Sequence, residues 1–96
     1  MKEKNIKNFK YYGIKKQMPV WCEEMSELTK EICKWARKGE YDKILLDNLK
    51  EKIVDVIVCL DQIIYAIGLE QEEIKERYKY KVERQKNRID DENARN

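Results

Sequence analysis

The sequence predicts an all-α protein, an antiparallel helical bundle of three main helices that is completed by homo-oligomerisation. Glycine and proline are scarce, with three and one in 96 residues, whereas a β-sandwich or barrel of this length needs many more turn residues. Hydrophobic residues make up 42% of the chain, which is too many for a disordered protein. Apolar residues also recur at helical spacing in three segments joined by short connections.

The first main helix follows a short N-terminal segment. Residues 1–11 are expected to form a poorly ordered basic leader, residues 12–89 a single helical domain, and residues 90–96 a polar tail. We predict the helix from about Lys15 to Lys38, because an apolar stripe advances in steps of four and three residues. This stripe comprises Trp21, Met25, Leu28, Ile32 and Trp35. Gly39 comes next, where glycine commonly ends a helix.

The second and third main helices are predicted from about Asp47 to Ile67 and from about Glu70 to Ile89. The third begins with acidic residues and ends with basic ones, as the helix dipole favours. The second has an apolar seam and further apolar residues on its other sides, so it needs more cover than two amphipathic neighbours provide. We therefore expect a dimer or tetramer with this helix near the subunit interface. Its seam comprises Leu49, Ile53, Val56, Leu60, Ile63 and Ile67.

Composition excludes several kinds of function. The chain has no histidine, and its three cysteines form no CxxC pair, so neither a Cys/His zinc site nor histidine-dependent catalysis is expected. Cys22, Cys33 and Cys59 are predicted to be small buried hydrophobes. The charged N-terminus lacks the apolar region of a signal peptide. The most apolar stretch, residues 53–69, contains two aspartates and is too short to span a membrane, so we expect a cytoplasmic protein.

Charge is segregated along the chain. Residues 1–16 and 75–88 are basic, whereas residues 17–74 are acidic. One interpretation is a solvated surface of salt-bridged helices. The other is an acidic cluster that holds a divalent cation beside basic side chains that hold phosphate.

Four acidic residues are candidates for such a cluster. Glu24 and Glu27 are three residues apart, so a helix presents both carboxylates on one face. Asp55 lies within an apolar run, where a buried carboxylate needs a partner, and Glu51 precedes it by four residues. If the first two helices pack antiparallel, the four carboxylates can surround a hard cation such as Mg²⁺. The alternative is that they are surface residues paired with nearby lysines.

These motifs together resemble those of the MazG-like all-α nucleoside triphosphate pyrophosphohydrolases, in particular the small phage- and prophage-type members. The resemblance rests on an EExxE helix at residues 23–27, a short connector, and a helix reading KEKIVDVIVCLDQI at residues 50–63. Supporting matches are YGIKKQ at residues 12–17 and YKVERQKNRI at residues 80–89. The resemblance therefore covers nearly the whole chain.

The resemblance implies an enzyme that uses Mg²⁺, or alternatively Mn²⁺, to cleave an NTP or dNTP to the monophosphate and pyrophosphate. Glu24, Glu27 and Asp55 would be metal ligands and would act in catalysis through the metal. Lys81 and Arg84 would bind the phosphate chain of the substrate. Gln17, with an aromatic residue such as Tyr12 or Trp21, is a candidate for contact with the base, although packing is the alternative role for the aromatics.

One position departs from the family pattern. The second motif is ExxD, and three residues before Asp55 this chain has Lys52 in place of glutamate. Either Glu51 takes over coordination with a shifted geometry, or the Lys52 ammonium pairs with Asp55 and weakens the metal site. Two other functions therefore stay open. One is a catalytically weakened relative that binds nucleotide or only oligomerises, and the other, ranked last, is an adaptor that binds nucleic acid through residues 75–88.

Overall fold

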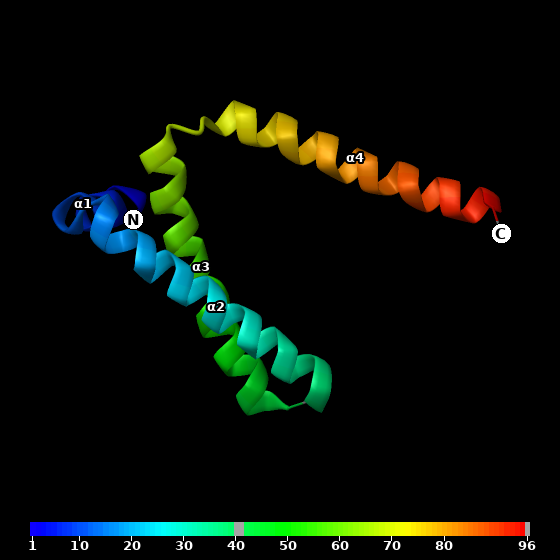
Figure 1. Cartoon of the computed structure of the whole chain (residues 1–96), viewed down its shortest axis with the longest axis horizontal. Helices are drawn as coiled ribbons and strands as arrows, with labels where there is room; N and C mark the ends of the chain where they lie inside the picture. The colour runs from blue at the N-terminus through cyan, green and yellow to red at the C-terminus, as the bar shows by residue number, and fades with distance from the viewer. Residues whose placement is uncertain (40–41, 96) are drawn as a thin grey trace.

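The structure, a computed structural model, describes residues 1–39 and 42–95 and contains four helices and no strand within them. The helices are α1 (Lys2–Tyr12), α2 (Ile14–Lys38), α3 (Lys43–Ile67) and α4 (Gln71–Arg95). Figure 1 shows α2 and α3 side by side as an antiparallel pair, with α1 at one end of the pair and α4 projecting away from it. The predicted all-α class is confirmed.

The helix boundaries follow from capping residues. Gly39 follows α2 as predicted, and its N–H donates to the carbonyl of Trp35 at 2.9 Å. The next helix begins earlier than predicted, at Lys43, because the side chain of Asp42 accepts a hydrogen bond from the Leu45 N–H at 3.1 Å and so caps the first turn. Gly68 ends α3 in the left-handed conformation, with φ 70°. Residues 40 and 41 of the expected connector, and residue 96 of the expected tail, lie outside the described residues.

The N-terminal segment differs from the expected poorly ordered leader, because it forms α1. Phe9 is buried and its ring stacks on Trp21, with the ring centroids 5.8 Å apart. The same ring meets Tyr65 edge-on at 6.1 Å. One aromatic side chain therefore fixes α1 across both α2 and α3.

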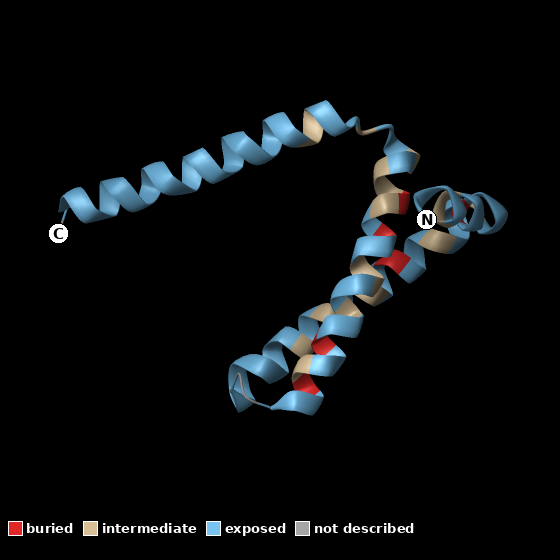
Figure 2. Ribbon diagram, turned by 180° about the vertical axis from the view of Figure 1, so that it is seen from behind, coloured by how far each residue is buried: buried red, intermediate tan, exposed pale blue. Residues whose placement is uncertain are grey.

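The core lies between α2 and α3, where Figure 2 shows the buried positions of the pair. Leu45 and Leu49 are buried near one end, and Phe9, Trp21 and Cys59 form a cluster near the other. The predicted apolar seam of α3 is only partly buried, since Ile53, Leu60 and Ile67 are exposed.

The cysteine prediction is right for one residue and wrong for two. Cys59 is buried, whereas Cys22 and Cys33 are exposed. Both exposed thiols lie on α2, whose buried side is narrower than its apolar sequence suggests. Trp21 is the one residue of this helix that is buried.

The last helix does not complete a three-helix bundle within one chain. Among the described residues, α4 contacts none of the other helices and contains no buried residue. The helix α1 contacts both α2 and α3 and so takes the place of a third helix at that end of the pair. None of the helices in the described residues combines the length and hydropathy that crossing a membrane requires.

Candidate active site

Acidic side chains of α2 and α3 meet partway along the helix pair. Glu24 lies three residues after the buried Trp21, and Asp55 lies four residues before the buried Cys59. Residues at these separations share a helix face, so both carboxylates follow the buried sides of their helices. They line the same hollow. The predicted meeting of Glu24 with Asp55 is therefore present in the structure.

The ammonium group of Lys52 lies among these carboxylates. Its Nζ is 2.8 Å from Oε2 of Glu27 and 3.8 Å from Oδ2 of Asp55. The hydrogen bond to Lys52, and then its charge, hold the pKa of Glu27 below its usual value. The same hydrogen bond raises the pKa of Lys52, so both groups stay charged at neutral pH.

Glu24 lacks such a partner. Its Oε2 is buried and accepts no hydrogen bond from the described residues. Burial raises the pKa of this carboxyl, followed in importance by the negative charges of Glu27 and Asp55. A buried carboxylate oxygen without a partner is costly, and a bound cation would remove that cost.

The carboxylates fit a metal ion only in part. Within residues 1–39 and 42–95, no group of three or more Cys, Asp or Glu side chains is arranged to hold a metal. Lys52 pairs with Glu27 at 2.8 Å and also lies 3.8 Å from Asp55, so of these three carboxylates Glu24 alone has no ion pair within the described residues. Mg²⁺ is commonly held by one or two carboxylates together with water and substrate phosphates, and Glu24 and Asp55 are the two that would hold such an ion in this hollow.

The hollow beside Glu24 has a volume of about 210 Å³ and combines polar and apolar walls. Its polar end is formed by the carboxylates, and its other walls by aliphatic, thiol and carboxamide groups from both helices. The lining residues are Gln17, Val20, Glu24, Asp55, Val58, Cys59 and Gln62. Gln17, predicted to contact a base, therefore lines the same hollow as the carboxylates.

A buried hydrogen-bond network that the sequence did not predict supports this wall. Gln62 is only 5% exposed, and its Oε1 accepts from Nε1 of Trp21 at 2.8 Å and from Nε2 of Gln17 at 3.0 Å. Its Nε2 donates to Oδ1 of Asn5 at 2.8 Å. The network joins α1, α2 and α3 and orients Gln17. Trp21 is 6% exposed and acts in packing. The sequence feature that could have indicated this network is Gln62 itself, a glutamine within the apolar run of α3.

Three predicted site residues are not brought to this place within one chain. Glu51 is exposed and does not line the hollow. Lys81 and Arg84 lie on α4, which contacts no other helix of the described chain. The Arg84 guanidinium instead lies over the ring of Tyr80, 6.0 Å from its centroid.

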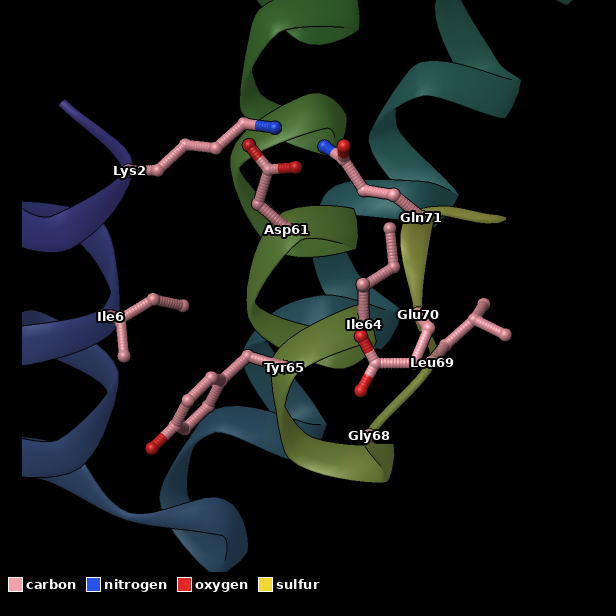
Figure 3. Close-up of a pocket in the computed structure, with 9 residues that line it drawn as sticks. All are labelled: Lys2, Ile6, Asp61, Ile64, Tyr65, Gly68, Leu69, Glu70 and Gln71. Carbon is pink, nitrogen blue, oxygen red and sulfur yellow. The ribbon is translucent and has the colours of Figure 1, made fainter. Parts of the chain in front are cut away.

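A larger hollow of about 410 Å³ lies between α1, the end of α3 and the start of α4. Figure 3 shows Lys2 and Gln71 pointing toward Asp61, with Ile6, Ile64 and Tyr65 around them. Here the negative charge of Asp61 faces a lysine from α1, and none of the predicted metal ligands is present. The smaller hollow is therefore the candidate active site.

Comparison with protein-family models, with curated proteins and with solved structures finds no match to this chain.

Proposed function

We propose that the chain is a MazG-like, Mg²⁺-dependent nucleoside triphosphate pyrophosphohydrolase that releases pyrophosphate and leaves the monophosphate. The observation that supports this function most is the buried Oε2 of Glu24, which has no hydrogen-bond donor in residues 1–39 and 42–95 and lies in the same hollow as Asp55. Two carboxylates from different helices, with an oxygen that lacks a donor, are suited to a divalent cation. The motif resemblance in the sequence points to the same residues.

The residues of this site have distinct roles in the proposed reaction. Glu24 and Asp55 would hold the metal, which when bound supplies positive charge for the phosphate oxygens and helps to activate water. Water would attack the α phosphorus and lose a proton to solvent, the bond to the oxygen bridging the α and β phosphorus atoms would break, and pyrophosphate would leave with that oxygen. Val58 and Cys59 would provide apolar contacts in the hollow, and Gln17 would present a carboxamide to the base. This chemistry requires no histidine.

We further propose that the protein is a homo-oligomer. On α3, Val54 is 56% and Ile57 is 50% exposed, next to exposed Ile53, Val58 and Leu60. A helix apolar on two sides is stable when both sides are covered. The exposed stripe of α4, which includes Tyr78, Val82 and Ile89, could cover α3 of a neighbouring copy.

Association would also bring the phosphate-binding candidates to the site. Lys81 and Arg84 are on a helix that does not reach the carboxylates of its own chain. In an oligomer, these residues of a neighbouring copy would bind the phosphate chain, where Arg and Lys are strong partners. The complete site would then contain residues of two copies.

The activity is tested by incubating the protein with Mg²⁺ and a panel of NTPs and dNTPs and separating the products. We expect pyrophosphate and monophosphate in equal amounts from at least one substrate. Glu24→Gln and Asp55→Asn should each lower the rate by about 100-fold or more, since each removes a proposed ligand. Glu23→Gln, at an exposed neighbouring position, is the control. Failure to cleave any triphosphate, or full activity of Glu24→Gln, would contradict the proposed activity.

A second candidate is a relative that binds nucleotide without cleaving it. The contact of 2.8 Å between Lys52 and Glu27 favours it, because this ion pair removes one carboxylate from the metal site. Calorimetry with a triphosphate and Mg²⁺ would then show binding, while no substrate of the panel is cleaved. Lys52→Glu should in that case create activity.

A further inference from the structure

We propose that the outer face of α1, together with the first turn of α2, binds single-stranded nucleic acid. This surface lies at the end of the helix pair where Figure 1 shows α1, and it contains none of the residues of the candidate active site. It is also distinct from residues 75–88, which lie on α4. We call it the N-terminal basic surface, and its residues are Lys4, Lys7, Tyr11, Tyr12, Lys15 and Lys16.

Two sides of α1 have different environments. Asn5 and Phe9, four residues apart, contact α2 and α3 and so define the packed side of the helix. Lys4, Lys7 and Tyr11 are separated by three and four residues, so they share a second face that is turned away from the packed one. All three are exposed. Two lysines and an aromatic ring therefore form a row along the outside of α1.

The positive charge of this surface is not neutralised locally. Residues 1–16 contain six lysines and one acidic residue, Glu3, whose carboxylate contacts the N-terminal ammonium at 3.3 Å. In the part of the chain that the structure describes, no ion pair includes a lysine of this segment. By contrast, Lys75, Arg77 and Lys86 of α4 pair with acidic residues of their own helix. A block of uncompensated lysines attracts a polyanion.

Lys15 and Lys16 continue the charge into α2. Both are exposed and lie in the first turn of this helix, which contains no acidic residue. The N-terminal end of a helix carries a partial positive charge, so two lysines at this place do not favour stability. Lysines and helix N-termini are, however, common partners of nucleic-acid phosphates. The position of these two residues is therefore explained by an anionic partner better than by the fold.

Two tyrosines lie between these pairs of lysines in the chain. Tyr11 is 82% and Tyr12 is 54% exposed, and their rings meet edge-on with the centroids 5.0 Å apart. An aromatic ring in water gains contact area when a nucleobase stacks on it. The bases of a single strand are available for such stacking, whereas those of a duplex are covered by their neighbours. The rings therefore favour a single strand, with its phosphates on the lysines.

An anionic membrane would also attract lysines, but the outer face of α1 fits it less well. A helix that lies on a membrane inserts an apolar face among the lipids. Apart from the tyrosines, the large apolar residues of α1 are Ile6 and Phe9, of which Phe9 is buried and Ile6 is half-buried. The exposed face thus presents lysines and tyrosine rings, which match phosphates and bases.

Binding is measured by fluorescence anisotropy with a labelled single-stranded oligothymidylate, in EDTA so that no metal ion contributes. We expect a dissociation constant on the order of 10⁻⁵ M at physiological salt. The logarithm of the binding constant should fall with the logarithm of the salt concentration with a slope of about −3, as four lysine–phosphate contacts on a single strand produce. The same strand paired with oligoadenylate should bind more weakly, because its bases cannot stack on the tyrosines.

Variants separate the lysines from the rings. Lys4→Gln combined with Lys7→Gln should reduce the slope to about −1.5, because two phosphate contacts are lost. Tyr11→Ala should weaken binding by about fivefold or more at an unchanged slope, since one stacked base is lost, and Tyr11→Phe should bind as tightly as the wild type. Arg37→Gln combined with Lys38→Gln removes the same charge from exposed positions in the last turn of α2 and should leave binding unchanged.

Three results would overturn the proposal: no binding of the single strand by the wild type, equal losses in the two double variants, or equally strong binding of the duplex. Binding to vesicles that contain phosphatidylserine, without binding to the oligonucleotide, would assign the surface to a membrane instead. The measurement uses neither Mg²⁺ nor a triphosphate, so the proposed pyrophosphohydrolase activity and this binding can each fail without the other.

Discussion

Glu24 carries an energetic cost in the fold that the proposed metal site would explain. Its buried oxygen has no donor among the residues that the structure describes, and burial and two neighbouring carboxylates raise its pKa. Ordinary surface glutamates avoid this cost by facing water. A carboxylate in such a position is consistent with a cation that binds there.

Glu24→Gln should therefore stabilise the metal-free protein at neutral pH, by about 0.5–1 kcal/mol. Because the folded-state pKa is raised, the ionised form of Glu24 destabilises the fold at pH values above it. This destabilisation is relieved as the pH falls through the raised pKa and is absent below the unfolded-state value. Urea unfolding in EDTA over this pH range should show the advantage of the variant shrinking as the pH falls. A variant less stable than the wild type at pH 7 would contradict this interpretation.

The thiols offer a second test at the scale of single residues. Burial, and then the charges of Glu24 and Asp55, raise the pKa of Cys59, so its reactive thiolate form is suppressed. With a thiol-specific chromogenic reagent at pH 8, Cys22 and Cys33 should react rapidly and Cys59 only after unfolding. Cys59→Ser should leave the rapid phase unchanged. Rapid reaction of all three thiols would be incompatible with the packing around Cys59.

Among the elements, α2 and α3 could be predicted because their patterns are long and periodic. The site could be predicted in part for the same reason, since a separation of three residues fixes Glu24 and Glu27 on one face. The buried seam of α3 was harder to predict. A helix sequence with apolar residues on several sides does not indicate which side packs against α2. Gln62 shows this most clearly, since a polar residue lies at the centre of the packed face.

The first helix could not be predicted, because its sequence is mostly charged and contains few apolar residues. Its position depends on long-range contacts of two residues, Asn5 and Phe9, which a local pattern cannot reveal. Phe9 packs on Trp21, and Asn5 both accepts from Gln62 and donates to the carbonyl of Val58 at 3.0 Å. Because α1 is held by so few contacts, the loss of any one of them should measurably lower the stability of the protein.

Phe9→Ala should accordingly lower the free energy of unfolding by about 2–4 kcal/mol, since it empties a buried aromatic position. Tyr11→Ala, on the same helix but with its side chain exposed, is the matched control and should cost less than about 1 kcal/mol. Chemical denaturation followed by circular dichroism measures both. Equal effects of the two substitutions would mean that α1 is not packed on α2 and α3 in solution.

For the whole molecule, the main question is whether a second copy covers the exposed apolar residues of α3 and α4. The sequence predicted a helix apolar on most sides, and the exposed Val54 and Ile57 agree with that prediction. The sequence did not predict that α4 would project away from the α2–α3 pair. The direction of a helix after a short connection depends on which surfaces are already covered, and α1 covers one of them.

Ile57→Asp should weaken association, because it places a charge at the centre of the proposed interface. We expect the mass measured by light scattering after gel filtration to fall from that of an oligomer to 11.7 kDa. Thr29→Asp, at an exposed position of α2, should leave the mass unchanged. A wild-type protein that is monomeric at high concentration would contradict the proposed interface.

The most direct test of the metal site is a crystal structure with Mn²⁺ and a triphosphate whose bond between the α and β phosphates cannot be hydrolysed. We predict one anomalous peak per active site, between Glu24 and Asp55, with ligand oxygens about 2.1–2.2 Å away and the α phosphate beside it. Carboxylates that stay apart around Lys52, with no metal peak at saturating Mn²⁺, would contradict the account.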